Sequence, residues 1–338
     1  MKFDFPEISK QEWLDKITTD LKGKPIENLN WQLSDNLKAT PFASIEDIES
    51  TQNLAINGDN NWYVLESITV KDLRQANEDA LIALEGGATA LSFDMEIAEC
   101  DFSRVLDTIN LEWIFIQING SDQHAKQFKN FLDQSSFDID KIDVAVANGG
   151  GLFEDIPTIK TIGIIEENSI AVDDELAVIL TKGSQQLIAS TSNAERIWFK
   201  VNLTNSFYQN ICKIRALKIL WSKICKGFDI ENSTAFIQAS MQSPLEDQDA
   251  DYAKIQAASQ AMAAAIGGAN VIYLPPTATS ESLEFHRRIA RNVHHLMQLE
   301  SFMDRVEDPS AGSYYLEQLT DTIAASAWKK FQLKYESL

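Results

Sequence analysis

The side chains best placed for chemistry are carboxylates, amides and hydroxyls that directly follow short apolar or β-branched runs of the chain. They are Glu66, Ser67, Asp94, Glu96, Asn119, Asn148, Glu166, Glu167, Asn202, Gln242 and Thr277. Such groups can move protons and exchange hydrogen bonds. None of them is His, Arg or Lys, although cations are the side chains that bind phosphate groups most strongly. The set predicts an acidic site that is poorly suited to phosphate-rich ligands.

Two other motifs could in principle bind a ligand. The histidines are His124, His286, His294 and His295, and no two have the i, i+4 spacing of a helical zinc site. The run Asn148-Gly149-Gly150-Gly151 follows an apolar run but lacks the Gly-Lys-Ser/Thr of a phosphate-binding loop. We therefore expect no metal site at the histidines and a tight turn at the glycines.

Composition limits the partners of the chain. Its 338 residues include 29 Lys and Arg against 50 Asp and Glu, a net charge of -21, which disfavours nucleic acid and anionic membranes. Cys100, Cys212 and Cys225 are odd in number and widely spaced, as expected of reduced thiols in a cytoplasmic protein. The sequence shows neither a signal-peptide pattern nor an apolar run long enough to span a membrane.

The elements that would position the candidate side chains alternate between short strands and helices. The predicted strands are Trp62–Ile68, Thr89–Phe93, Trp113–Ile118, Ile142–Ala147, Thr161–Ile165, Arg196–Val201, Ala235–Ser240 and Asn270–Leu274. The clearest predicted helices are Asp72–Glu85, Asp173–Leu187, Phe207–Lys226, Tyr252–Ile266 and Ser282–Met303. Eight strands in repeated βα order favour an α/β fold of the (β/α)8 TIM-barrel type, with an open doubly wound sheet as the alternative.

The chain divides into three predicted parts. Residues 1–58 form an N-terminal extension, residues 59–304 form the barrel, and residues 305–338 form a C-terminal helical segment. On its residues alone, the extension is expected to pack on its own barrel.

Three blocks near the C-terminus carry a family resemblance. They are Ala261-Met262-Ala263-Ala264-Ala265-Ile266-Gly267-Gly268, then Arg288-Ile289-Ala290-Arg291-Asn292, then Asp308-Pro309-Ser310-Ala311-Gly312-Ser313-Tyr314-Tyr315. In this order and at these separations they resemble the barrel domain of the methylmalonyl-CoA mutases. Within the blocks, Arg291 is expected to support barrel structure, with ion pairs to neighbours such as Glu284, and Tyr314 and Tyr315 are expected to pack.

The resemblance also shows which substrate contacts are missing at the first strand. Catalytic subunits of this family carry Trp-Thr-Ile-Arg-Gln-Tyr where this chain has Trp62-Tyr63-Val64-Leu65-Glu66-Ser67. Leu65 therefore replaces the arginine, and Ser67 replaces a tyrosine that contacts substrate.

Later strands show the same loss. Counting back from Glu175-Leu176-Ala177 places Gly163 and Ile164 where catalytic subunits have Tyr-His, so the histidine that contacts the thioester is missing. An Arg-Thr-His-Ser-Gln-Thr-Ser-Gly-Trp pattern becomes the run from Ala235 to Ser243, which ends in Met241-Gln242-Ser243. We expect Leu65, Ser67, Gly163, Ile164, Asn202 and Gln242 to form a degenerate substrate site without catalytic residues.

The cofactor expectation also follows from the resemblance. Relatives that bind cobalamin supply a histidine from an Asp-x-His-x-x-Gly motif in a separate C-terminal domain, and this chain has no such motif. The resemblance implies a non-catalytic small subunit that binds no cofactor or metal itself. Its partner would be a large subunit carrying adenosylcobalamin, in a heterodimer that converts methylmalonyl-CoA to succinyl-CoA. The resemblance also implies that the extension wraps a partner subunit, because related mutases begin with a stretch similar to Phe5-Pro6, Trp13 and Asp20-Leu21-Lys22-Gly23. This reading and packing on its own barrel can hold at once.

Two other functions stay open at this point. One is a mutase-like barrel whose altered pocket accepts a different acyl-CoA. The other is a non-enzymatic scaffold that forms a homodimer. A fold alone does not separate these possibilities.

Overall fold

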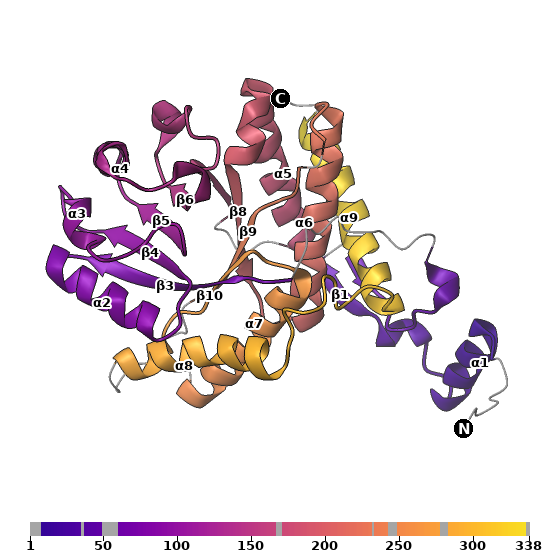
Figure 1. Cartoon of the computed structure of the whole chain (residues 1–338). Coiled ribbons are helices and arrows are strands. Elements are labelled where there is room, and N and C mark those ends of the chain that lie inside the picture. The colour runs from indigo at the N-terminus through magenta and orange to yellow at the C-terminus, as the bar shows by residue number, and fades with distance from the viewer. Residues whose placement is uncertain are drawn as a thin grey trace.

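A computed structural model describes residues 8–34, 37–48, 60–166, 171–231, 233–242, 249–277 and 283–335 (Figure 1). Eight parallel strands form one sheet. They are β3 (Tyr63–Val70), β4 (Ala90–Met95), β5 (Phe115–Asn119), β6 (Asp143–Val146), β7 (Ile162–Ile165), β8 (Ile197–Leu203), β9 (Ile237–Met241) and β10 (Val271–Tyr273). Their order is β6-β5-β4-β3-β10-β9-β8-β7, so the first and last barrel strands in the chain, β3 and β10, are neighbours.

Lys160 closes the sheet into a barrel. It pairs in parallel with Ala145 of β6, and its backbone N–H and C=O bond Val144 and Val146 at 2.8 Å each. Two residues later the same segment becomes β7, which pairs with β8. All eight predicted strands are present, and the (β/α)8 architecture is confirmed.

Helices and short turns cover the outer face of the barrel. The helices are α2 (Leu73–Glu85), α3 (Phe102–Val105), α4 (Asp122–Gln134), α5 (Val172–Ala189), α6 (Phe207–Gly227), α7 (Ala250–Gly267), α8 (Leu283–His295) and α9 (Tyr314–Tyr335). The 3-10 turns are η3 (Ile139–Lys141), η4 (Gly150–Phe153) and η5 (Thr191–Arg196). Outward-facing side chains of the strands pack on these helices in two large apolar clusters. One contains side chains of β3 to β6, and the other contains side chains of β7 to β10 together with Val64 of β3.

Local chemistry sets several helix ends. Asp72 caps α2 by accepting from the backbone N–H groups of Arg74 and Gln75, and Gly268 ends α7 at φ 80. The glycine run after β6 forms the turn η4, as predicted. The helix predicted up to Met303 is wrong at its end: α8 stops at His295 and continues as a π-helical turn, η6 (Leu296–Glu300). Its predicted start at Ser282 lies outside the described residues.

The N-terminal segment consists of α1 (Lys10–Asp20), η1 (Ile26–Leu29), the hairpin β1 (Trp31–Ser34) with β2 (Leu37–Ala39), and η2 (Ile45–Asp47). The hairpin and helix α1 differ in how they contact the barrel. Leu37 and Ala39 are buried in the cluster that contains α5 and α9. Helix α1 buries none of its residues and extends away from the barrel (Figure 1).

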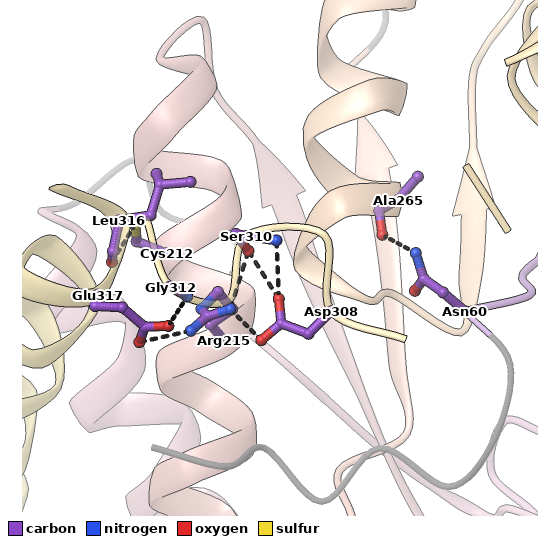
Figure 2. Close-up of polar contacts among 9 residues, drawn as sticks. All are labelled: Asn60, Cys212, Arg215, Ala265, Asp308, Ser310, Gly312, Leu316 and Glu317. Atoms are coloured by element: carbon purple, nitrogen blue, oxygen red, sulfur yellow. Dashed lines mark hydrogen bonds and ion pairs between the residues drawn. The ribbon is translucent and has the colours of Figure 1, made fainter. Parts of the chain in front are cut away.

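The C-terminal block holds the last helix against α6. Arg215 of α6 is fully buried and pairs with Asp308 and Glu317, the latter at 2.8 Å, and it donates to Ser310 Oγ at 2.9 Å (Figure 2). Cys212, one turn earlier, donates to the carbonyl of Leu316, and burial raises the pKa of its thiol to about 12. The three cysteines are free and buried.

Asn60 ties the start of the barrel to its last turns. Its side-chain amide donates to the carbonyls of Ala265 and Met303 at 3.1 and 3.2 Å. Among the described residues, no helix combines the length and apolar character needed to cross a membrane.

Candidate functional site

The N-terminal end of the barrel interior is filled with aromatic rings. Phe115 lies between Tyr63 and Phe236, with ring centroids 5.6 Å apart on both sides. Lys160 places its ammonium 4.4 Å from the centroid of Phe236 and pairs with Asp143 at 3.7 Å. The phenol of Tyr63 donates to Asp143 at 2.9 Å.

The middle of the interior is apolar and also closely packed. Leu65, at the predicted arginine position, is 5% exposed and lies in one cluster with Ala90, Ala145, Trp198 and Val271. Gly163 faces the same interior, because a Cβ built on it would lie 2.9 Å from the indole of Trp198. The indole thus fills the space next to Gly163.

Ile164 lies on the opposite side of its strand. It is 4% exposed and packs in the outer cluster with α5 and α6. Since neighbouring residues of a strand point to opposite faces, a side chain at 164 in this register does not reach the interior. Of the two positions matched to Tyr-His, only Gly163 borders the candidate site.

Polar side chains at the mouth of the barrel bind one another. Asp94 accepts hydrogen bonds from Ser67 and from Asn119, the latter at 2.6 Å. Asn119 also donates to Ser92 at 2.9 Å and accepts from Gln117 at 2.7 Å. Ser67, Asp94 and Asn119 were predicted from the sequence, and the fold brings them together. Most of their hydrogen-bonding capacity is used within the network.

The interior carries a lysine that the sequence reasoning missed. Lys200 sits mid-strand in β8, level with Gln238, and its ammonium is 5.4 Å from the centroid of Trp198. Burial lowers its pKa, and the nearby Asp94 carboxylate opposes that shift. The prediction counted only strand ends. The alternation of β8, in which Trp198, Lys200 and Asn202 share a face, could have revealed it.

Tyr273 is the last residue of β10. Burial raises the pKa of its phenol, and the carboxylate of Asp94 adds to the shift. Asp94 thus interacts with both the ammonium of Lys200 and the phenol of Tyr273, which the raised pKa keeps protonated at neutral pH.

Other predicted residues lie outside this network. Glu66 points outward and pairs with Arg291 of α8, while Arg291 also bonds Glu284 at 2.7 Å, as predicted. Burial raises the pKa of Glu66, and Arg291 opposes the shift.

Glu166 pairs with Lys182 at 3.2 Å. Four more predicted side chains bind neighbours or lie at the edge of the mouth, and one falls outside the described residues. They are Glu96 with Lys71, Asn148 with the carbonyl of Gly120, Thr277 with His286, exposed Gln242, and undescribed Glu167.

The histidines do not suit cobalt ligation. His294 accepts a hydrogen bond from the indole of Trp62 at 3.0 Å, and burial lowers its pKa to about 3. His124 accepts from the backbone of Ser121 at the start of α4, and His286 and His295 belong to α8 beside His294. All four stand on covering helices, so none projects from a strand into the mouth. The residues present do not fit a cobalamin site.

Comparisons with known proteins give the family. A family model described as methylmalonyl-CoA mutase matches residues 165–334. The chain belongs to the methylmalonyl-CoA mutase family. The match covers β8 to β10, helices α5 to α9 and all three sequence blocks.

Similar proteins carry small-subunit and large-subunit names. The chain is 28% identical to the methylmalonyl-CoA mutase small subunit of Porphyromonas gingivalis, over 97% of this chain and 63% of that protein. It is 32% identical to the small subunit of Propionibacterium freudenreichii subsp. shermanii, covering 47% of this chain and 27% of that protein. It is also 32% identical to the large subunit of Streptomyces virginiae, covering 50% and 25%. The chain thus spans less than two thirds of these relatives.

Proposed function

We propose that this chain is the non-catalytic small subunit of a heterodimeric methylmalonyl-CoA mutase. The complex interconverts methylmalonyl-CoA and succinyl-CoA, and this chain stabilises the large subunit. Family membership and similarity to small subunits support a role as one subunit of an isomerase complex, which we expect to work in the cytoplasm. The observation that carries the non-catalytic role is the barrel interior at Leu65, Gly163 and Trp198. Apolar groups pack closely there, at and beside two positions that the family resemblance matches to substrate contacts.

Energetics support the loss of substrate binding. A charge-assisted hydrogen bond contributes about 1.5–3 kcal/mol, and an unpaired ligand charge in an apolar site costs more. Leu65 cannot replace an arginine in this respect, and Gly163 offers no side chain at all. The hydroxyl of Ser67 is already bound to Asp94. The six degenerate positions are therefore assigned no catalytic role.

The partner large subunit would hold adenosylcobalamin, which supplies radical chemistry when bound. This chain holds no histidine suited to cobalt. Its contribution is a pseudo-symmetric barrel whose core and interface are retained while its site is lost. We assign residues 59–304 to the barrel, residues 305–338 to a C-terminal helical segment and residues 1–58 to an extension. Within the extension, α1 is the part that reaches toward a partner, because it buries nothing on its own barrel.

Calorimetric titration with methylmalonyl-CoA tests this function. The chain alone, the cognate large subunit alone and their mixture are titrated side by side. We expect no heat from the chain alone and saturable heat from the mixture. Micromolar binding by the isolated chain would contradict the non-catalytic assignment, and failure to form a complex would contradict the pairing.

Lys200 favours a second candidate, a mutase-like barrel that binds a different acyl-CoA. Its buried ammonium is a cation in a position to meet a phosphate or a carboxylate. This candidate requires that the isolated chain binds an acyl-CoA and that Lys200→Met weakens the binding at least tenfold. If a panel of short acyl-CoAs produces no heat with the wild-type chain, this candidate is excluded for that panel.

A further inference from the structure

Large apolar side chains are exposed at Trp113, just before β5, and along residues 296–306, which follow α8. Each member is more than half exposed, with Trp113 at 79%, Leu299 at 69% and Phe302 at 57%. We call the group the base patch, and it consists of Trp113, Leu296, Leu299, Phe302 and Val306. Trp113 and Leu299 line one hollow together with Asn61, Tyr63 and Asp304. Exposed apolar side chains gathered in this way mark interaction surfaces.

The backbone after α8 is built so that these side chains face out. The π-helical turn η6 is followed by Phe302 at φ 52, a conformation that is uncommon for a bulky residue. Hydrogen bonds from Ser301 N–H to the Leu296 carbonyl and from Met303 N–H to the Met297 carbonyl fix the turn at 2.9 and 3.0 Å. Met297 and Met303 pack into the core cluster, while Leu296, Leu299 and Phe302 point away from it.

Carboxylates lie next to the members of the base patch along the chain. Glu112 precedes Trp113 and interacts with the ammonium of Lys141, and Glu300, Asp304 and Glu307 lie within the same segment as the other members. In the described residues 296–307 the opposing cation is Arg305, which pairs with Asp304 at 3.5 Å. A second copy of this chain would bring the same carboxylates against these. An apolar surface framed by Lys and Arg is complementary to this face.

We propose that the base patch is the surface on which the large subunit docks, through an apolar contact framed by basic residues. This inference rests on the proposed pairing of this chain with the large subunit, and it adds which face of the barrel forms the contact. Trp113 and Leu299, which share the hollow, are the central anchors, since buried aromatic and apolar side chains at the centre of an interface contribute most of the binding free energy. The acidic rim sets orientation and the rate of association.

The test measures binding of the purified cognate large subunit to variants of the full chain by calorimetry. We expect the double variant Trp113→Ser with Leu299→Ser to raise the dissociation constant at least tenfold. Ile255→Ser is the matched control, because Ile255 on α7 is 69% exposed, as Leu299 is, but lies on another element. We expect this control to bind like the wild type. Unchanged thermal unfolding of all variants shows that the loss is one of contact.

A second pair of variants tests the rim. Glu300→Lys with Glu307→Lys should weaken binding, and the wild-type affinity should fall as salt rises, because both remove attraction to a basic partner. Equal binding by the patch variants and the wild type would overturn the assignment of this face while leaving the pairing intact. No binding by the wild-type chain would overturn the pairing itself. Wild-type self-association that Trp113→Ser abolishes would assign the patch to a second copy instead.

Discussion

Gly163 and Trp198 occupy one space inside the barrel. They are partners on neighbouring strands, and a Cβ added to Gly163 would stand 2.9 Å from the indole of Trp198. A side chain at 163 and this indole therefore exclude each other. The indole fills the interior at this level, and a side chain at 163 fits only if the indole moves.

Gly163→Ala is expected to lower the free energy of unfolding by about 1–3 kcal/mol, because the added methyl overpacks the interior. Trp198→Phe in the same chain should recover part of the loss, since the smaller ring leaves room. Chemical denaturation of both variants measures the effect. Gly227→Ala is the control, as nothing lies within 4 Å of a Cβ there. Equal effects at both glycines would contradict the packing argument.

Arg215 is expected to be essential for the last helix. Arg215→Met leaves buried Glu317 and partly buried Asp308 without their cation, which should lower the free energy of unfolding by about 3–5 kcal/mol. Adding Asp308→Asn and Glu317→Gln should recover part of that. The control Arg74→Ala breaks an exposed pair with Glu78 and should cost less than about 1 kcal/mol. A loss at Arg215 no larger than the control would show that the cluster is dispensable.

The barrel could be predicted from the sequence because the patterns that indicate its strands and turns are local. Each of the eight strands is a short buried run, and glycines such as Gly268 mark where helices turn back into strands. The end of α8 was missed for the opposite reason. The run from Leu296 to Met303 keeps a helical pattern of apolar residues, but it alternates between the core and an exposed surface, which the pattern alone does not distinguish.

The candidate site could be predicted only in part. Ser67, Asp94 and Asn119 were found because they end strands, and parallel strands bring their ends to one edge. Lys200 was missed because it sits earlier in its strand, where depth in the barrel depends on the stagger between strands. Likewise the side on which Ile164 lies depends on the register of β7, which the residue count could not give.

Stability is expected to depend on pH through His294. The native pKa is lowered to about 3 from an ordinary 6.5 by burial, so the unfolded chain binds a proton that the native chain does not. The stabilisation is fully present above pH 6.5 and is lost as the pH falls toward 3. In His294→Gln this loss is absent, so the stability difference from wild type should shrink between pH 7.5 and pH 4.5. Urea denaturation across that range measures it, and a constant difference would contradict it.

The two ends of the N-terminal segment should respond differently to truncation of a side chain. Leu37 is 6% exposed and packs in the main cluster, so Leu37→Ala should lower the free energy of unfolding by about 2–5 kcal/mol. Trp13 is 38% exposed and contacts the ring of Phe42 within the same segment, so Trp13→Ala should cost less than about 1 kcal/mol in the isolated chain.

Binding of the large subunit should reverse this order. If α1 covers the partner, Trp13→Ala weakens the complex severalfold while Leu37→Ala acts through folding alone, which denaturation with and without the partner separates. A large loss of stability for Trp13→Ala in the isolated chain would mean that α1 packs on its own barrel. The hairpin then anchors the segment and α1 is the part free to bind, because in residues 8–34 and 37–48 the buried side chains are Leu37 and Ala39 of the hairpin.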